Sequence, residues 1–270
     1  MVMAAENEKR SKIGRASSII PFGLFSMLFY LLPQVAAGDA FRIQLDWIPS
    51  LGITLSLTID GLSLLFGLII CGAGFFESLY AADYLPAKSE TGKFYIYLHG
   101  FLLAMLGLVV ADNILVMFVF WELTTLISYL LIGFECQLES ARQNARQALL
   151  VTGAGGLALL VGFLLLGNIA NSYDLSQISL QSGIVKADPL YLAVLVMVFT
   201  GSFTKSAQFP FHFWLPNAMT APTPISAFLH SATMVKAGIY LLARLHPILG
   251  GTLAWMGTLV LAGGITALLG

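Results

Sequence analysis

Charged side chains are scarce in this sequence. Asp, Glu, Lys and Arg make up 10% of the 270 residues, whereas hydrophobic residues make up 58% and the mean hydropathy is +0.86. A globular protein carries about 25% charged residues, because water must cover its surface. This shortage excludes an ordinary soluble domain, and we expect an integral membrane protein whose surface faces lipid.

Two further shortages narrow the range of possible functions. The net charge of -1 leaves no basic excess for binding nucleic acid. The two cysteines, Cys71 and Cys136, lie far apart, which excludes a disulfide scaffold and offers no metal-ligand spacing. The sequence also lacks a nucleophile constellation and a phosphate-binding loop. We therefore expect a transporter function rather than an enzyme, with no cofactor and no metal.

Long apolar runs are what the sequence has instead. In lipid every backbone polar group must be satisfied internally, so a span is a helix of about 20 residues or a strand of a closed barrel. The runs are too long and too continuous for barrel strands. We predict an all-α, polytopic membrane helix bundle with eight units: Ile19–Ala37, Ile59–Tyr80, Phe94–Val110, Ile114–Phe134, Ala148–Ala170, Leu190–Gln208 with a broken continuation to Asn217, Pro222–Leu245 and Thr252–Gly270.

The first unit has two interpretations. Basic residues precede a short apolar stretch, and Val35–Ala37 would suit a signal peptidase site. A protein with many spans needs no cleaved signal, so we favour an uncleaved helix and keep a signal peptide as the alternative. Residues 1–18 then form a charged N-terminal segment ahead of a transmembrane domain over residues 19–270.

Loop charges predict the orientation, because cytoplasmic loops carry an excess of Lys and Arg. The loops that share a side with the N-terminus hold Lys9, Arg10, Lys12, Arg15, Lys88, Lys93, Arg142 and Arg146. The opposite loops hold Arg42 and Lys186, with Arg244 near a helix end. We expect a cytoplasmic N-terminus. The outer segment then includes Ile53–Thr58, whose alternating pattern predicts a short hairpin.

Three charged residues stand out inside the predicted spans, namely Glu122, Lys205 and Lys236, and His230 precedes the last of them by six positions. A charge at the bilayer centre costs about 2.5–3.5 kcal/mol on insertion scales, so such residues are usually functional. The alternatives are a purely structural ion pair between Glu122 and Lys205 and a packed histidine. The combination of an acid, two buried bases and a histidine favours a proton path.

One helical face of the seventh unit is polar. Ser226, His230 and Thr233 are spaced i, i+4 and i+7, with Lys236 at the margin of the same stripe. Such a stripe points away from lipid. By contrast, Asp60 and Glu77 lie near span ends, where we expect their side chains to reach the headgroup region.

Prolines interrupt the sixth unit. Proline removes a backbone donor and clashes with the preceding turn, so the helix must break near Gln208. Broken backbone at membrane depth recurs at transporter ion sites. The freed carbonyls favour a cation on Lys205, whereas desolvation disfavours it, so a small movement can switch its charge. The prolines concerned are Pro210, Pro216, Pro222 and Pro224.

Several segments around these residues resemble the proton-conducting antiporter-like family. This family comprises the large membrane subunits of respiratory complex I and of the Mrp-type multisubunit sodium/proton antiporters. Within it the chain is most similar to the A-type subunits of the Mrp antiporters. The matching segments are Trp121–Glu122, Ser128–Phe134, Ser206–Pro210, Trp214–Met219, Ala221–Ala227 and His230–Gly238.

The resemblance implies a role for each matching residue. Glu122 would be the acid that modulates the central lysine, and Lys205 would be that lysine, on a broken helix. His230 would carry protons onward with Lys236 beyond it, and His212 is a weaker relay candidate. The implied function is one proton half-channel of a monovalent cation (Na⁺)/proton antiporter in the cell membrane.

The resemblance also implies what surrounds this chain. The family is built from two inverted repeats, and only the first fits here, over about residues 94–246. We therefore expect as partners further subunits of an antiporter complex, one of them a chain that supplies the second repeat. Two alternatives stay open: a proton-pumping membrane subunit of a complex I-type NADH/quinone oxidoreductase, and an inactive truncated remnant.

Overall fold

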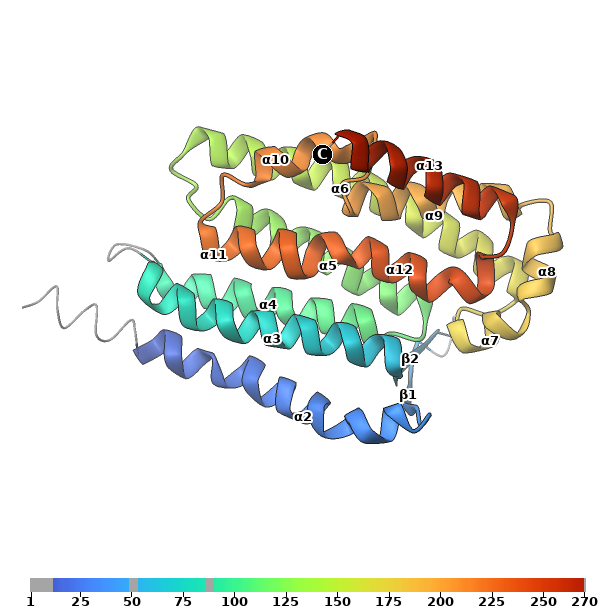
Figure 1. Cartoon of the computed structure of the whole chain (residues 1–270), viewed down its shortest axis with the longest axis horizontal. Helices are drawn as coiled ribbons and strands as arrows, with labels where there is room; N and C mark the ends of the chain where they lie inside the picture. Colours follow the sequence, from blue (N-terminus) through green and yellow to red (C-terminus); the bar gives the residue numbers. More distant parts are fainter. Residues whose placement is uncertain (1–11, 49–52, 86–89, 270) are drawn as a thin grey trace, which may run out of the picture.

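The computed structural model describes residues 12–48, 53–85 and 90–269 as a bundle of long helices lying side by side (Figure 1). Six helical segments are long and apolar enough to cross a membrane, and two shorter apolar helices accompany them. This confirms the predicted all-α bundle of eight units. The segments are Lys12–Ala36, Gly61–Tyr84, Thr91–Val110, Ile114–Ile132, Glu139–Ala170 and Thr223–Leu249, with Tyr191–Lys205 and Leu253–Leu269 as the shorter pair.

Lys12, the first described residue, already belongs to the first helical segment, so the end of the predicted charged N-terminal segment is part of it. Three of the basic residues on which the predicted orientation depends, Lys9, Arg10 and Lys88, lie outside the described residues. The orientation therefore stays a prediction.

Long helices that follow one another in the sequence pack side by side, and the buried core lies between them. Helix α2 packs on α3, α4 packs on both α3 and α5, and α6 packs on both α5 and α9. Their bounds are α2 Ile19–Ala36, α3 Gly61–Tyr84, α4 Thr91–Val110, α5 Ile114–Ile132, α6 Glu139–Ala170, α7 Leu175–Leu180, α8 Ser182–Ala187, α9 Tyr191–Lys205, η2 Phe211–Phe213, α10 Trp214–Ala218, α11 Thr223–Ser226, η3 Ala227–Thr233, α12 Met234–Leu249 and α13 Leu253–Leu269.

A two-stranded sheet closes one end of the bundle (Figure 1). Strands β1 (Phe41–Ile48) and β2 (Ile53–Ile59) pair antiparallel, which confirms the predicted hairpin. Arg42 on β1 lies 2.8 Å from the carboxylate of Asp112 and 3.6 Å from that of Asp174. These two acids sit after α4 and before α7, so one guanidinium ties the hairpin to two helix connections.

Helix α9 ends at Lys205, earlier than the break near Gln208 that the prolines predicted. Ala207 adopts a left-handed conformation with φ of 49°, and two backbone bonds close the end of the helix. The amide of Gln208 donates to the carbonyl of Phe203 at 2.9 Å, and that of Ala207 donates to Thr204 at 3.4 Å. This is a Schellman-type ending, which satisfies carbonyls that a helix end would leave free. The turn therefore ends α9, and the prolines follow it.

The segment after the break contains a π-helix, η3, between α11 and α12. A π-helix has more residues per turn than an α-helix, so the i, i+4, i+7 spacing of Ser226, His230 and Thr233 does not follow one α-helical face. Of the three, His230 and Thr233 are buried and Ser226 is half-buried. Single π-helical turns occur often at functional sites.

The side chain of Asp60, which we expected to reach the headgroup region, makes contacts within the protein. Its carboxylate caps α3 by accepting from the backbone of Ser63, and it is paired with Arg244 of α12. Arg244 in turn donates to the hydroxyl of Tyr240, which donates to the carbonyl of Val109 at 2.6 Å. The chain of contacts links α3, α12 and α4.

We expect Arg244→Met to lower stability near neutral pH by about 1–2 kcal/mol, allowing for partial solvent screening of the pair. Burial alone raises the pKa of Asp60, but hydrogen bonds from Arg244 and Ser63 outweigh it and lower the pKa from 3.8 to about 2. The contribution of this pair is therefore present above about pH 4 and is lost as pH falls toward 2. Thermal unfolding in detergent across this range measures it.

The matched control is Arg142→Met. Arg142 pairs with Glu139 on an exposed helix end, where such pairs contribute little. A stability difference between wild type and Arg244→Met that stays constant between about pH 5 and pH 2 would contradict the assignment.

Candidate functional site

Lys205 is fully buried at the end of α9, with 0% of its surface exposed. Its ammonium nitrogen donates to the backbone carbonyl of Trp121 at 3.0 Å and to the hydroxyl of Thr125 at 2.7 Å. It also lies 5.0 Å from the centroid of the Trp121 ring, a cation–π distance. Helix α5 thus holds the lysine through a carbonyl, a hydroxyl and an aromatic face.

Glu122 is the residue that directly follows the carbonyl to which Lys205 donates. It is half-buried, and its Oε1 is buried without a hydrogen-bond partner among the described residues. No ion pair joins it to Lys205 within that part of the chain, so the lysine rests on the backbone beside the acid. A carboxylate and an ammonium about 4 Å apart attract by about 4 kcal/mol at an effective dielectric near 20.

His230 lies in the π-helix η3 and is 7% exposed. Both ring nitrogens are buried, and neither meets the criteria for a hydrogen bond with a protein group in the described part. The Trp214 ring contacts it edge-on, with the ring centroids 6.1 Å apart. The Trp214 indole also donates to the carbonyl of Thr204 at 2.9 Å. Trp214 therefore connects His230 to the residue that precedes Lys205.

Lys236 departs from the prediction. Its side chain is exposed on α12, although we expected it to be buried with Glu122 and Lys205. The reason is the π-helix, which changes the phase of the residues that follow it. His212 in η2 is also exposed. The proton-carrying roles of both residues stay predictions.

Three of the helix-break prolines lie between α9 and α11, and the fourth, Pro224, lies in α11 itself. Pro210 and Pro216 are exposed, Pro222 is half-buried, and Pro224 is buried at the start of α11. The chain between α9 and α11 forms only two short helices, η2 and α10. None of them can donate a backbone hydrogen bond, since proline has no N–H.

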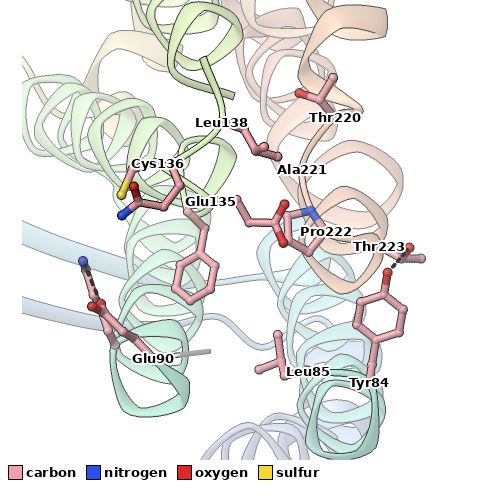
Figure 2. A pocket seen from close by; sticks show the side chains of 13 residues that line it. Tyr84, Leu85, Glu90, Glu135, Cys136, Leu138, Thr220, Ala221, Pro222 and Thr223 are labelled. Atoms are coloured by element: carbon pink, nitrogen blue, oxygen red, sulfur yellow. Dashed lines mark hydrogen bonds and ion pairs between the residues drawn. The ribbon is translucent and has the colours of Figure 1, made fainter. Parts of the chain in front are cut away.

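A cavity of about 780 Å³ opens at the end of the bundle opposite the hairpin. Its walls come from the end of α3, the start of α4, the α5–α6 connection and the turn before α11. Figure 2 shows the Glu135 carboxylate beside Pro222, and the Tyr84 hydroxyl bonded to Thr223. Glu90 pairs with Lys93 at its rim, with the two charged atoms 2.9 Å apart. The cavity brings polar groups to the turn that leads into α11.

Sequence reasoning missed several members of the site. The Trp121 carbonyl and the Thr125 hydroxyl bind Lys205, yet a backbone group leaves no mark in a sequence. Thr125 stands one helical turn after Trp121, and that spacing was the one available signal. Gly155 and Gly156 of α6 were also missed. Because they have no side chains, they leave the space that Thr204 and Glu122 occupy.

Known families and curated relatives match most of the chain. The family described as NADH:quinone oxidoreductase/Mrp antiporter, TM, matches residues 111–270, and the family described as NADH-ubiquinone oxidoreductase (complex I), chain 5 N-terminus, matches residues 47–95. The A-type subunit of a Na⁺/H⁺ antiporter from Alkalihalophilus pseudofirmus is 46% identical over 93% of this chain and 31% of its own length. The A/B-type subunit of a probable K⁺/H⁺ antiporter from Rhizobium meliloti is 44% identical over 98% of this chain and 26% of its own length.

Two solved structures have the same fold. An Mrp complex from Dietzia sp. DQ12-45-1b aligns with a TM-score of 0.83 at 36% identity, covering 100% of this chain and 31% of that chain. The membrane-bound sulfane sulfur reductase, an archaeal respiratory complex, aligns with a TM-score of 0.78 at 22% identity over 96% of this chain and 55% of that one. The chain thus spans about a third or less of the antiporter subunits that it matches. It belongs to the NADH:quinone oxidoreductase/Mrp antiporter transmembrane family.

Proposed function

We propose that this chain supplies an intramembrane proton half-channel to a multisubunit monovalent cation/proton antiporter. The observation that carries the proposal is the fully buried Lys205, which α5 holds beside Glu122. One carboxylate oxygen of Glu122 is buried and has no hydrogen-bond partner among the described residues. A buried cation and a nearby acid are costly to keep inside a membrane protein, and such residues usually mark an ion or proton pathway. The similarity to antiporter subunits named for Na⁺/H⁺ and K⁺/H⁺ exchange supports the same function.

The proposed relay has two positions for the lysine. In the first, Lys205 donates to Trp121 and Thr125, as it does here. In the second, it turns to Glu122, and the attraction within the pair favours an ammonium and a carboxylate. A proton that leaves Lys205 in the first position passes on to His230 on the far side of Trp214. The exposed Lys236 would then carry it beyond this chain.

The cavity at the α11 end is the proposed entry from the cytoplasm. Its side of the bundle carries the loops with Lys93, Arg142 and Arg146, which the positive-inside rule assigns to the cytoplasm. Its carboxylates Glu90 and Glu135 would raise the local cation and proton concentration. In this orientation the hairpin of β1 and β2 faces outward, and the membrane is the cell membrane.

Cation-driven proton movement in inverted vesicles that contain the whole complex tests the function. Adding Na⁺ or K⁺ is expected to release protons from acid-loaded vesicles, because the antiporter exchanges one ion for the other. Vesicles without the complex give the background. Proton movement that responds only to NADH and quinone would instead favour the complex I-type alternative, and no response to either would favour an inactive remnant.

A further inference from the structure

Two consecutive glycines in α6, Gly155 and Gly156, lie beside the site and face two different neighbouring helices. Both are buried, and α6 packs against both α5 and α9. Small residues let membrane helices approach closely, but here the two glycines also meet functional groups. A Cβ atom at either position would collide with a side chain of the neighbouring helix.

Gly156 makes room for the acid. A Cβ at this position would lie 1.8 Å from Oε1 of Glu122, which no real contact allows, and 3.0 Å from its Cδ, which is unusually tight. The neighbouring Trp121 ring atom is farther, at 3.5 Å, which is ordinary van der Waals contact. The Glu122 carboxylate therefore occupies the space that any other residue at 156 would fill with its side chain.

Gly155 makes room for the lysine-bearing helix. A Cβ at 155 would lie 1.8 Å from Oγ1 and 2.6 Å from Cβ of Thr204, the residue before Lys205. The Cβ of Thr204 moves only with its backbone, so α9 would have to shift as a whole. Gly201 repeats the contact from α9, since a Cβ there would lie 2.6 Å from Cβ of Leu159.

We infer that Gly155 and Gly156 are positioning residues for the Glu122–Lys205 pair. Gly156 sets the place of the Glu122 carboxylate, and Gly155 sets the approach of α9 that lets Lys205 reach α5. Neither residue carries a proton, and both act through the side chains that they admit. The inference deepens the proposed proton half-channel and rests on it.

Gly156→Ala tests the inference, with Gly153→Ala as its matched control. Gly153 lies in the same helix, and a Cβ there would meet nothing within 4 Å. Both substitutions gain the same intrinsic helix propensity, so they differ in the contact alone. Because the atoms struck in Gly156→Ala belong to the flexible end of Glu122, the helices stay in place and the complex assembles.

Two measurements are made on each variant in the intact complex. The first is the infrared carboxyl band that disappears in Glu122→Gln, and the second is cation-driven proton exchange. Gly156→Ala is expected to shift the band and to slow exchange by about tenfold or more, since a misplacement on the order of 1 Å can cost about 10²-fold. Gly153→Ala is expected to keep both at wild-type values.

Three results would overturn the positioning role of Gly156. They are a band and a rate like those of Gly153→Ala, a loss of exchange with an unshifted band, and a failure of Gly156→Ala to assemble. Failure of the proposed function gives a different result, namely Glu122→Gln exchanging at the wild-type rate. The band measurement still reports in that case whether Gly156 places the carboxylate.

Discussion

Complexes that carry Lys205→Met are expected to lose cation-driven proton exchange and to stay assembled. Methionine has no titratable group, so the proton can no longer occupy the centre of the proposed relay. We expect the fold to tolerate the change, because Lys205 forms no ion pair with Glu122 among the described residues, so its replacement by an apolar side chain of similar length breaks no joined pair. The Trp121 carbonyl also keeps two donors, the hydroxyls of Thr124 at 2.7 Å and Thr125 at 3.2 Å. Exchange in inverted vesicles, normalised to the amount of complex, measures the loss.

Lys186→Met is the matched control for this substitution. Lys186 lies in the last turn of the short helix α8, outside the apolar helices that are long enough to cross the membrane. Its replacement removes the same charge by the same change of side chain. We expect its exchange rate to equal that of the wild type, so a general effect of lost positive charge is separated from an effect at the site.

Glu122→Gln is expected to slow exchange by about tenfold or more, because a positioned group that transfers protons contributes about 10²–10⁴-fold. Glutamine keeps the size and shape of the side chain beside Gly156, so the packing of α5 against α6 is preserved. What it loses is the ability to take up a charge and to draw Lys205 away from Trp121 and Thr125. The rate of exchange and its dependence on pH measure this change.

Glu139→Gln provides the comparison for Glu122→Gln. Glu139 stands in the first turn of α6, exposed, and pairs with Arg142. Its replacement removes one carboxylate from the same chain without touching the buried pair. Equal rates for Glu122→Gln and Glu139→Gln would contradict the role of Glu122.

The bundle itself could be predicted from the sequence, because the thickness of the bilayer, and not the details of packing, sets the length of an apolar span. Most of the predicted units begin and end within a few residues of the observed helices. The larger differences have local causes. Helix α6 begins at Glu139, well before the predicted Ala148, because its polar first turns extend beyond the apolar run. Helix α9 ends early because Ala207 takes a left-handed conformation, which alanine rarely does.

The site was accessible only in part. Buried charges stand out in an apolar sequence, so Glu122, Lys205 and His230 could be named from their cost alone. Lys236 was predicted to be buried, but the π-helix that contains His230 changes the helical phase ahead of Lys236, and no residue pattern indicates such a helix. The partners of Lys205 on α5 are a carbonyl and a hydroxyl, which depend on how two distant helices meet. The roles of the named residues in carrying protons stay predictions.

The rate of cation-driven proton exchange by intact complexes with Lys205→Met, compared with Lys186→Met at equal assembly, tests the central claim most directly. If Lys205 is the centre of a proton half-channel, the Lys205→Met rate falls to that of vesicles without the complex, whereas Lys186→Met keeps the wild-type rate. A Lys205→Met complex that exchanges ions as fast as the Lys186→Met complex would contradict the claim.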